Sequence, residues 1–93
     1  MSTMFALSAK LTFFLPGAAS LKDKRQVRRS LMDKTRQRFN VSIAEVGAQD
    51  IHQRLIIGVA VISGDASHAR RSLDEVIRFM EEHAGAELTE VER

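Results

Sequence analysis

The sequence predicts an α+β fold in which two helices cover one face of a four-stranded antiparallel sheet. Three observations predict it. Two segments, residues 20–39 and 66–83, have the apolar spacing of amphipathic helices. Four shorter segments have strand character, and the combined order is β-α-β-β-α-β. The chain has 93 residues, so we expect one domain that spans residues 1–93.

The first strand is expected over residues 4–14, where apolar and polar side chains alternate as in a half-buried strand. Its apolar face carries Phe5, Leu7, Ala9, Leu11 and Phe13. A turn over residues 15–19 follows, because Pro16 and Gly17 interrupt the alternation.

The next segment reads as a helix that begins after Ser20. The Ser20 hydroxyl can accept a hydrogen bond from an amide of the first turn, and Asp23 places a carboxylate at the positive helix end. At about 100° per residue, one side of the helix is expected to be buried. This inward stripe consists of Leu21, Val27, Leu31, Thr35 and Phe39.

The second and third strands are expected over residues 40–47 and 54–63, joined by a polar connection, residues 48–53. The third strand is apolar on both faces, which is typical of a central strand. Asp65 can cap the second helix, and Gly85 ends it. Residues 86–92 alternate weakly, so they are expected to form an edge strand.

Together these elements predict the ferredoxin-like fold, because right-handed β-α-β crossovers place both helices on the same face of the sheet. The expected core includes Leu7, Leu11, Val27, Leu31, Ile57, Val59, Leu73 and Ile77. The other sheet face is expected to stay open, with Ala6, Ser8, Lys10, Ile56, Gly58, Ala60 and Ile62. Such a partly apolar open face favours contact with a partner or with a second copy of the chain.

Composition excludes several classes of protein. The chain has no cysteine, so disulfides and thiolate metal sites are excluded. The apolar run of residues 4–15 lacks a preceding basic segment and is interrupted by Ser8, Lys10 and Thr12, so we do not expect it to be a signal peptide. No apolar run approaches the ~20 residues of a membrane span. We therefore expect a cytoplasmic protein that has no membrane contact and needs neither a cofactor nor a metal.

The positive charge is concentrated in the first helix. Between Lys22 and Arg38 there are eight basic and two acidic residues, net +6, whereas the rest of the chain carries six basic and ten acidic residues, net −4. This asymmetry favours a polyanionic partner, although a solvated helix face explains the same residues. The candidate nucleic-acid- or anion-binding residues are Lys22, Lys24, Arg25, Arg29 and Arg36.

Two further clusters have chemical potential. The helix start from Gly17 to Arg25 combines free amides with cations and could bind an anion, but an ordinary turn explains it too. Glu45, Asp50 and His52 could bind a metal or move protons, but a loop held by side-chain hydrogen bonds explains them as well. We find no complete catalytic constellation, so no catalytic or metal-binding residue is predicted.

The predicted order of elements is shared with RNA-recognition modules, which stack bases on aromatic side chains of the open sheet face. The third strand has no aromatic residue, and the first strand offers that face only Phe14, at its end. Sequence-specific base stacking across the sheet is therefore disfavoured.

Several motifs carry a family resemblance. They are SLKDKRxVxxSL at residues 20–31, RFNVSIAEV at 38–46, the pairs Gln49-Asp50 and Gln53-Arg54, and GVAVIS at 58–63. The chain resembles the YlxP-like bacterial family, a domain of unknown function. The resemblance implies a ferredoxin-like fold, no established activity and a family site at Glu45, Asp50, Gln53 and Arg54. It also implies genes that lie beside those for a translation initiation factor and a ribosome-binding factor.

We therefore expect a non-enzymatic protein that binds RNA or a ribosomal particle through its basic helix. The alternative is a homo-oligomeric interaction module, most simply a dimer, whose partner is protein. A third hypothesis is an enzyme that binds a phosphorylated small molecule at the helix start, Gly17–Arg25.

Overall fold

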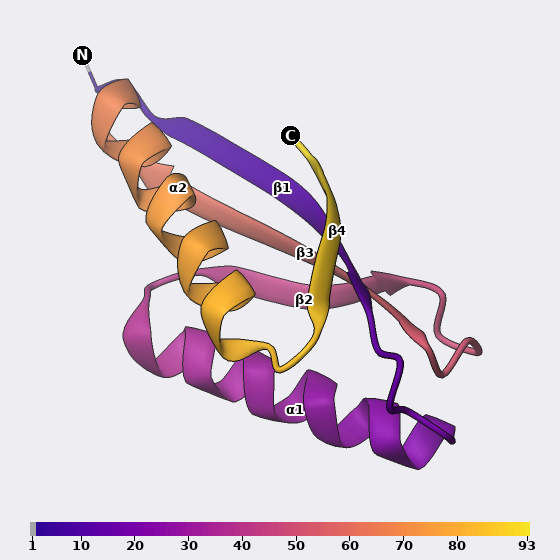
Figure 1. Ribbon diagram of the computed structural model, residues 1–93. Coiled ribbons are helices and arrows are strands. Elements are labelled where there is room, and N and C mark those ends of the chain that lie inside the picture. Colours follow the sequence, from indigo (N-terminus) through magenta and orange to yellow (C-terminus); the bar gives the residue numbers. More distant parts are fainter. Residues whose placement is uncertain (1) are drawn as a thin grey trace.

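The computed structural model describes residues 2–93 and has the predicted order of elements (Figure 1). The elements are β1 (Phe5–Phe14), α1 (Leu21–Arg38), β2 (Ser42–Gly47), β3 (Arg54–Ser63), α2 (Ala66–His83) and β4 (Glu87–Glu92). The bounds of β3 and α2 are those expected from the sequence. The strand β2 begins two residues later than predicted, at Ser42.

The four strands form one antiparallel sheet in the order β2-β3-β1-β4. The long strands β1 and β3 are its centre and pair along their whole length, from Phe5 opposite Ser63 to Phe14 opposite Arg54. The edge strand β4 pairs only with the second half of β1, and its register shifts between Thr12 and Phe13. This confirms β3 as a central strand and β4 as an edge strand.

Each helix begins at the cap that the sequence predicts. The Ser20 hydroxyl accepts a hydrogen bond from the Asp23 amide at 3.2 Å, and the Asp23 carboxylate accepts one from the Ala19 amide at 2.9 Å. The Asp65 carboxylate accepts hydrogen bonds from two amides of the first turn of α2. Gly85, with φ of +64°, lies in the left-handed region just after this helix and ends it.

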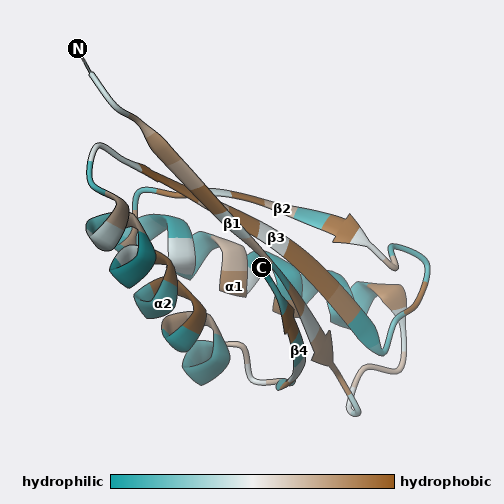
Figure 2. Ribbon diagram, turned by 90° about the horizontal axis from the view of Figure 1, so that it is seen from above, coloured by the Kyte–Doolittle hydropathy of each residue, from teal (hydrophilic) through white to brown (hydrophobic). Residues whose placement is uncertain are grey.

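Both helices pack on one face of the sheet, and the core lies between the two layers (Figure 1). The hydropathy colouring shows mostly hydrophobic central strands and helices that mix hydrophilic and hydrophobic residues (Figure 2). The side chains with almost no exposed surface include Leu11, Phe13, Leu31, Leu55, Ile57 and Met80. Of the predicted core, Leu7 and Val27 are only half-buried, and they pack against the rim of this cluster.

Two expectations about burial were wrong. Leu21 is exposed, and Lys24 takes the inward position of the first turn of α1 instead. Phe5 is exposed and lies at the end of the sheet, opposite Ser63. Thr12 is buried between β3 and β4, which flank it on either side. Within residues 2–93, neither helix is long and apolar enough to cross a membrane.

Candidate functional site

The outward side of α1 carries four exposed cations, which we call the basic face: Lys22, Arg25, Arg29 and Arg36. At 100° per residue they lie on one side of the helix, opposite the buried Leu31 and Thr35. Lys22, Arg25 and Arg29 have no acidic partner within 4.0 Å among the described residues. Their charges therefore face solvent and are available to a ligand.

Arg36 is exposed but partly engaged. Its guanidinium lies 3.9 Å from the carboxylate of Asp33 and donates a hydrogen bond to the Ile43 carbonyl at 3.3 Å. These contacts fix it against β2, so it has less freedom to reach a ligand than Arg25 or Arg29. Two more exposed cations, Lys34 and Arg38, lie on the flank and at the end of the helix, and the predicted set did not include them.

Lys24 was predicted among the binding cations, and this assignment was wrong. The residue is 2% exposed, and its side chain points from α1 toward the sheet and the connection between β2 and β3. Its ammonium donates hydrogen bonds to the carbonyls of Ala48 and Ile51 and lies 3.0 Å from Glu45 Oε2. A buried ammonium needs such partners, because desolvation of an unpaired charge is costly.

Glu45 lies between two cations of α1. Its Oε1 accepts a hydrogen bond from Arg28 at 3.0 Å, while Oε2 has no aligned hydrogen bond and is balanced by the Lys24 charge. Burial by itself raises the pKa of Glu45, but hydrogen bonding and charge from Lys24 and Arg28 outweigh it and lower the pKa below 4.5. The carboxylate is therefore ionised at neutral pH and acts as a structural anchor rather than as an acid.

This network fixes the connection between β2 and β3. Ala48, the first residue after β2, has φ of 53°, a left-handed conformation that is uncommon for a residue with a side chain. Its carbonyl and that of Ile51 both accept hydrogen bonds from Lys24. A further hydrogen bond joins the Leu15 amide to the Gln53 carbonyl at 2.9 Å. The loop is thus tied to both α1 and the end of β1.

The family site implied by the resemblance does not form one cluster. Glu45 lies under α1, Asp50 is an exposed loop residue, and Gln53 and Arg54 line a pocket at the end of the sheet. His52 is also exposed. Residues 2–93 contain no group of three or more His, Asp or Glu side chains that could hold a metal ion.

The helix start offers less to an anion than the sequence indicated. The amides of Ala19 and Asp23 already donate to the side chains of Asp23 and Ser20. Lys24 faces the interior, which leaves Lys22 and Arg25 as the exposed cations of this turn. The segment Gly17–Arg25 is therefore a capped helix start next to two surface charges.

A pocket of about 370 Å³ lies at the end of the sheet where β1 finishes, and we call it the end pocket. Its lining residues are Thr12, Phe13, Phe14, Ile51, Gln53, Arg54, Thr89 and Glu90. Phe14 is 41% exposed and Ile51 is 49% exposed, so two apolar side chains face solvent at its rim. Sequence reasoning missed this pocket because it joins three segments whose meeting depends on the tertiary fold.

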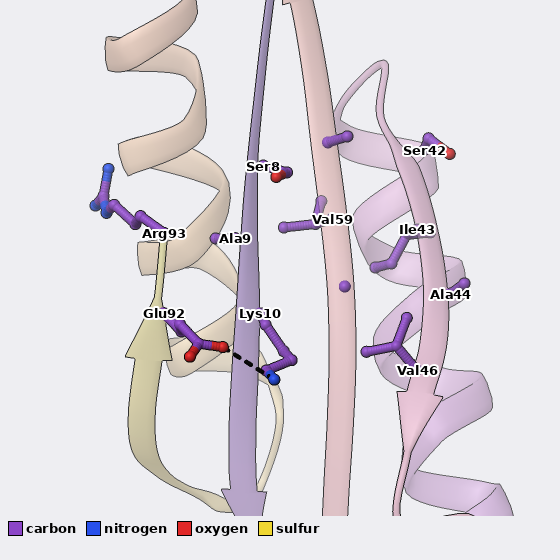
Figure 3. A pocket seen from close by; sticks show the side chains of 12 residues that line it. Ser8, Ala9, Lys10, Ser42, Ile43, Ala44, Val46, Val59, Glu92 and Arg93 are labelled. Carbon is purple, nitrogen blue, oxygen red and sulfur yellow. Dashed lines mark ion pairs between the residues drawn. The ribbon is translucent and has the colours of Figure 1, made fainter.

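The open face of the sheet has a shallow hollow of about 490 Å³ (Figure 3). Small side chains such as Ser8, Ala44 and Ala60 contribute to its lining, and Lys10 reaches across to Glu92 with an ion pair of 2.9 Å. Hydrogen bonding to Glu92 raises the pKa of Lys10 above 10.5. The hollow is lined mainly by small and apolar side chains, with Lys10, Glu92 and Arg93 toward the β4 edge.

The Lys24–Glu45–Arg28 network is the main feature that sequence reasoning missed. Its signal was present, because Lys24, Arg28, Leu31 and Thr35 share one side of a helix at intervals of three and four residues. Glu45 follows Ile43 by two, which places both on the helix-facing side of β2. The helical spacing of Lys24 and Arg28 and the strand alternation of Ile43 and Glu45 together could have predicted that Glu45 faces these two basic side chains.

Comparison with known proteins places the chain in a family. It is 36% identical over 72 residues to the uncharacterized protein YlxP of Bacillus subtilis (strain 168), covering 77% of this chain and 78% of that protein. It also resembles the solved C-terminal segment of the alpha subunit of aIF2 from Pyrococcus abyssi, with a TM-score of 0.57 at 15% identity. That match covers 98% of this chain but only 51% of the other, so the chain spans about half of that structure, and the likeness shows the fold alone. The family described as "Protein of unknown function (DUF503)" matches residues 7–93, and the chain therefore belongs to this family, as the YlxP-like motifs indicated.

Proposed function

We propose that the protein binds single-stranded RNA, free or on a ribosomal particle, through the basic face of α1. The observation that carries the proposal is the exposure of Lys22, Arg25 and Arg29 on one side of a single rigid helix, with no acidic partner in the described chain. A row of unpaired cations attracts the phosphate backbone, and arginine can contact a phosphate through two parallel hydrogen bonds.

The rest of the molecule supports the placement of this surface. The carboxylates of Glu87, Glu90 and Glu92 are exposed on β4, at the sheet edge away from β2. The basic face of α1 attracts a polyanion more strongly than this strand does, so the charge distribution favours binding with the phosphates toward α1. Backbone contacts of this kind carry little sequence information, so most of the affinity should be independent of the RNA sequence.

The test is a binding titration of a single-stranded RNA oligonucleotide at several salt concentrations. Replacing Arg25→Gln and Arg29→Gln together removes two contacts without touching the core, because both side chains are exposed. Each phosphate contact on a single strand contributes roughly 0.7 to the slope of log affinity against log salt, so the double variant should flatten the slope by about 1.4. Affinity at low salt should also fall.

The matched control is the double variant Arg70→Gln and Arg71→Gln, which removes the same charge from exposed positions of α2. It should retain the wild-type slope if α1 is the interface. Equal curves for the wild type and the Arg25/Arg29 variant, or no binding to RNA or ribosomal subunits at low salt, would contradict the proposal.

A second candidate function is self-association through the open sheet face. Ile62 is 68% exposed and Val46 is 50% exposed, and both lie on this face beside small side chains. Apolar side chains of this size gain free energy when a second protein surface covers them. This candidate is compatible with RNA binding, because α1 lies on the other side of the sheet (Figure 1).

A further inference from the structure

We propose that the end pocket receives one unpaired nucleobase of the RNA. This inference rests on the proposed function and adds a second site of contact between the protein and the RNA, besides the basic face. The pocket combines a partly exposed aromatic ring, an apolar rim and polar side chains of both hydrogen-bonding kinds. A base needs these groups together, because it has two flat faces for stacking and a polar edge.

The apolar part of the pocket comes from Phe13, Phe14 and Ile51. Phe13 is fully buried and forms part of the floor, whereas Phe14 and Ile51 retain exposed surface at the rim. The Phe14 ring belongs to the last residue of β1, so the strand fixes its backbone while its side chain stays accessible. An accessible ring on a fixed backbone suits stacking, since little conformational freedom is lost when a base binds.

The polar part comes from Gln53, Arg54 and Glu90. A glutamine amide both donates and accepts, a guanidinium only donates, and a carboxylate only accepts, so the three can pair with the mixed edge of a base. A purely apolar ligand would gain no hydrogen bond from these three exposed side chains. A phosphate entering the pocket would meet the Glu90 carboxylate, so the base and not the backbone is expected to enter.

The walls of the pocket are fixed before a ligand arrives. The loop residue Ile51 is held through its carbonyl by Lys24 at 3.0 Å, and the Gln53 carbonyl accepts the Leu15 amide at 2.9 Å. On the opposite side, the Thr89 hydroxyl donates to the Thr12 carbonyl at 3.1 Å, which joins β4 to β1. A buried lysine is thus used to position a loop that forms one wall of the pocket.

The pocket lies at the end of the molecule where α1 begins. The contact between Lys24 and Ile51 joins the first turn of α1 directly to the pocket loop, and Lys22 and Arg25 flank Lys24 in the chain. Both views show the end of β1, the loop between β2 and β3 and the start of α1 at the same end of the protein (Figures 1 and 2). A single strand that passes round this end can place one base in the pocket, while phosphates further along the strand contact Lys22 and Arg25 on the other side of the sheet.

The first experiment tests the pocket without any phosphate. Adenosine, cytidine, guanosine and uridine are titrated separately into the ¹⁵N-labelled protein, and amide chemical shifts are followed by NMR. At least one nucleoside should shift the amides of Phe14, Gln53 and Arg54, while amides on the outer side of α1 stay in place. Phe14→Leu, which removes the flat ring but keeps an apolar side chain, should abolish these shifts.

The second experiment uses the RNA titration described above. Phe14→Leu should lower affinity for the single strand by up to roughly 5- to 150-fold, as expected for loss of one base–aromatic stacking contact. It should leave the salt slope unchanged because no phosphate contact is lost. The matched control is Phe5→Leu, an exposed phenylalanine at the opposite end of β1, which should bind as the wild type does.

The two proposals fail separately. If no nucleoside shifts the pocket amides, or if Phe14→Leu and Phe5→Leu bind RNA equally, the pocket is not a base site, although the effect of Arg25→Gln and Arg29→Gln can still support RNA binding by α1. If no RNA binds at low salt, the proposed function fails. Nucleoside shifts at the end pocket would then show a nucleoside site, and the assignment of that site to RNA would be wrong.

Discussion

The Lys24 ammonium is a buried charge that holds β2 and the connection between β2 and β3 against α1. It meets the carboxylate of Glu45 and two loop carbonyls within one helical turn of exposed Lys22 and Arg25. The sequence predicted the basic character of this helix correctly but not the different role of Lys24. The helical period alone predicted that Leu21 points inward. In the structure Lys24 is buried instead, because it pairs with Glu45 on β2, and this tertiary contact is not visible in the helical pattern.

The ionisation of Glu45 predicts how stability depends on pH. The pKa of Glu45 is lowered in the folded protein, so its contribution to stability is complete above about pH 4.5, the ordinary value, and is lost as the pH falls through the folded pKa. The charged groups that face it are Lys24 and Arg28. Wild-type protein should therefore lose stability in acid partly through this one carboxylate.

The comparison that isolates it is urea denaturation of the wild type and Glu45→Gln between about pH 7 and pH 2. The variant should be less stable at neutral pH, and the difference should shrink as the pH falls below 4.5. Glu87→Gln, at an exposed position of β4, is the control and should show a small difference throughout. A Glu45→Gln difference that stays constant with pH would contradict this assignment.

At the scale of elements, the ends of helices and strands were predictable wherever a local residue type determines them. Asp65 and Gly85 mark the two ends of α2, and the apolar run of β3 ends at Gly64 with no ambiguity. The start of β2 was not predictable in the same way. Asn40 and Val41 have strand character, but pairing with β3 begins only at Ser42, opposite Ala60.

The cap of α2 gives a prediction at this scale. Gly85 has φ of +64°, and a Cβ built there would meet no atom within 4 Å, so any cost of Gly85→Ala is conformational and not steric. We expect Gly85→Ala to lower the free energy of unfolding by about 1 kcal/mol, the cost of a left-handed conformation for an L-residue. Gly17→Ala is the matched control, because its Cβ also meets nothing but its φ is not in the left-handed region. Gly17→Ala should be neutral or slightly stabilising in the same urea titration, and equal losses in both variants would show that φ is not the cause.

At the scale of the whole molecule, the two faces of the protein differ in kind. The outer face of α1 is polar and basic. The open sheet face carries small and partly apolar side chains and is hollowed (Figure 3). The sequence predicted both surfaces because each follows from a single period, 3.6 residues for the helix and two for the strands. The end pocket could not be predicted, because it depends on a loop conformation that Lys24 fixes and on the register of β4.

The open face predicts a self-associated state in solution. Ile62 and Val46 are exposed beside Ala6, Ala44 and Ala60, and burying them against a second copy removes apolar surface from water. Light scattering at tens of micromolar protein should report a dimer for the wild type, and Ile62→Lys should shift it toward monomer without loss of fold, since the position is already exposed. The control is Leu21→Lys, at an exposed residue of α1 on the other side of the sheet, which should remain dimeric. A wild type that is monomeric at these concentrations would contradict self-association. A dimer that persists in both Ile62→Lys and Val46→Lys would show that the open face is not the dimer contact. The unpaired edge of β2 would then be the next surface to mutate.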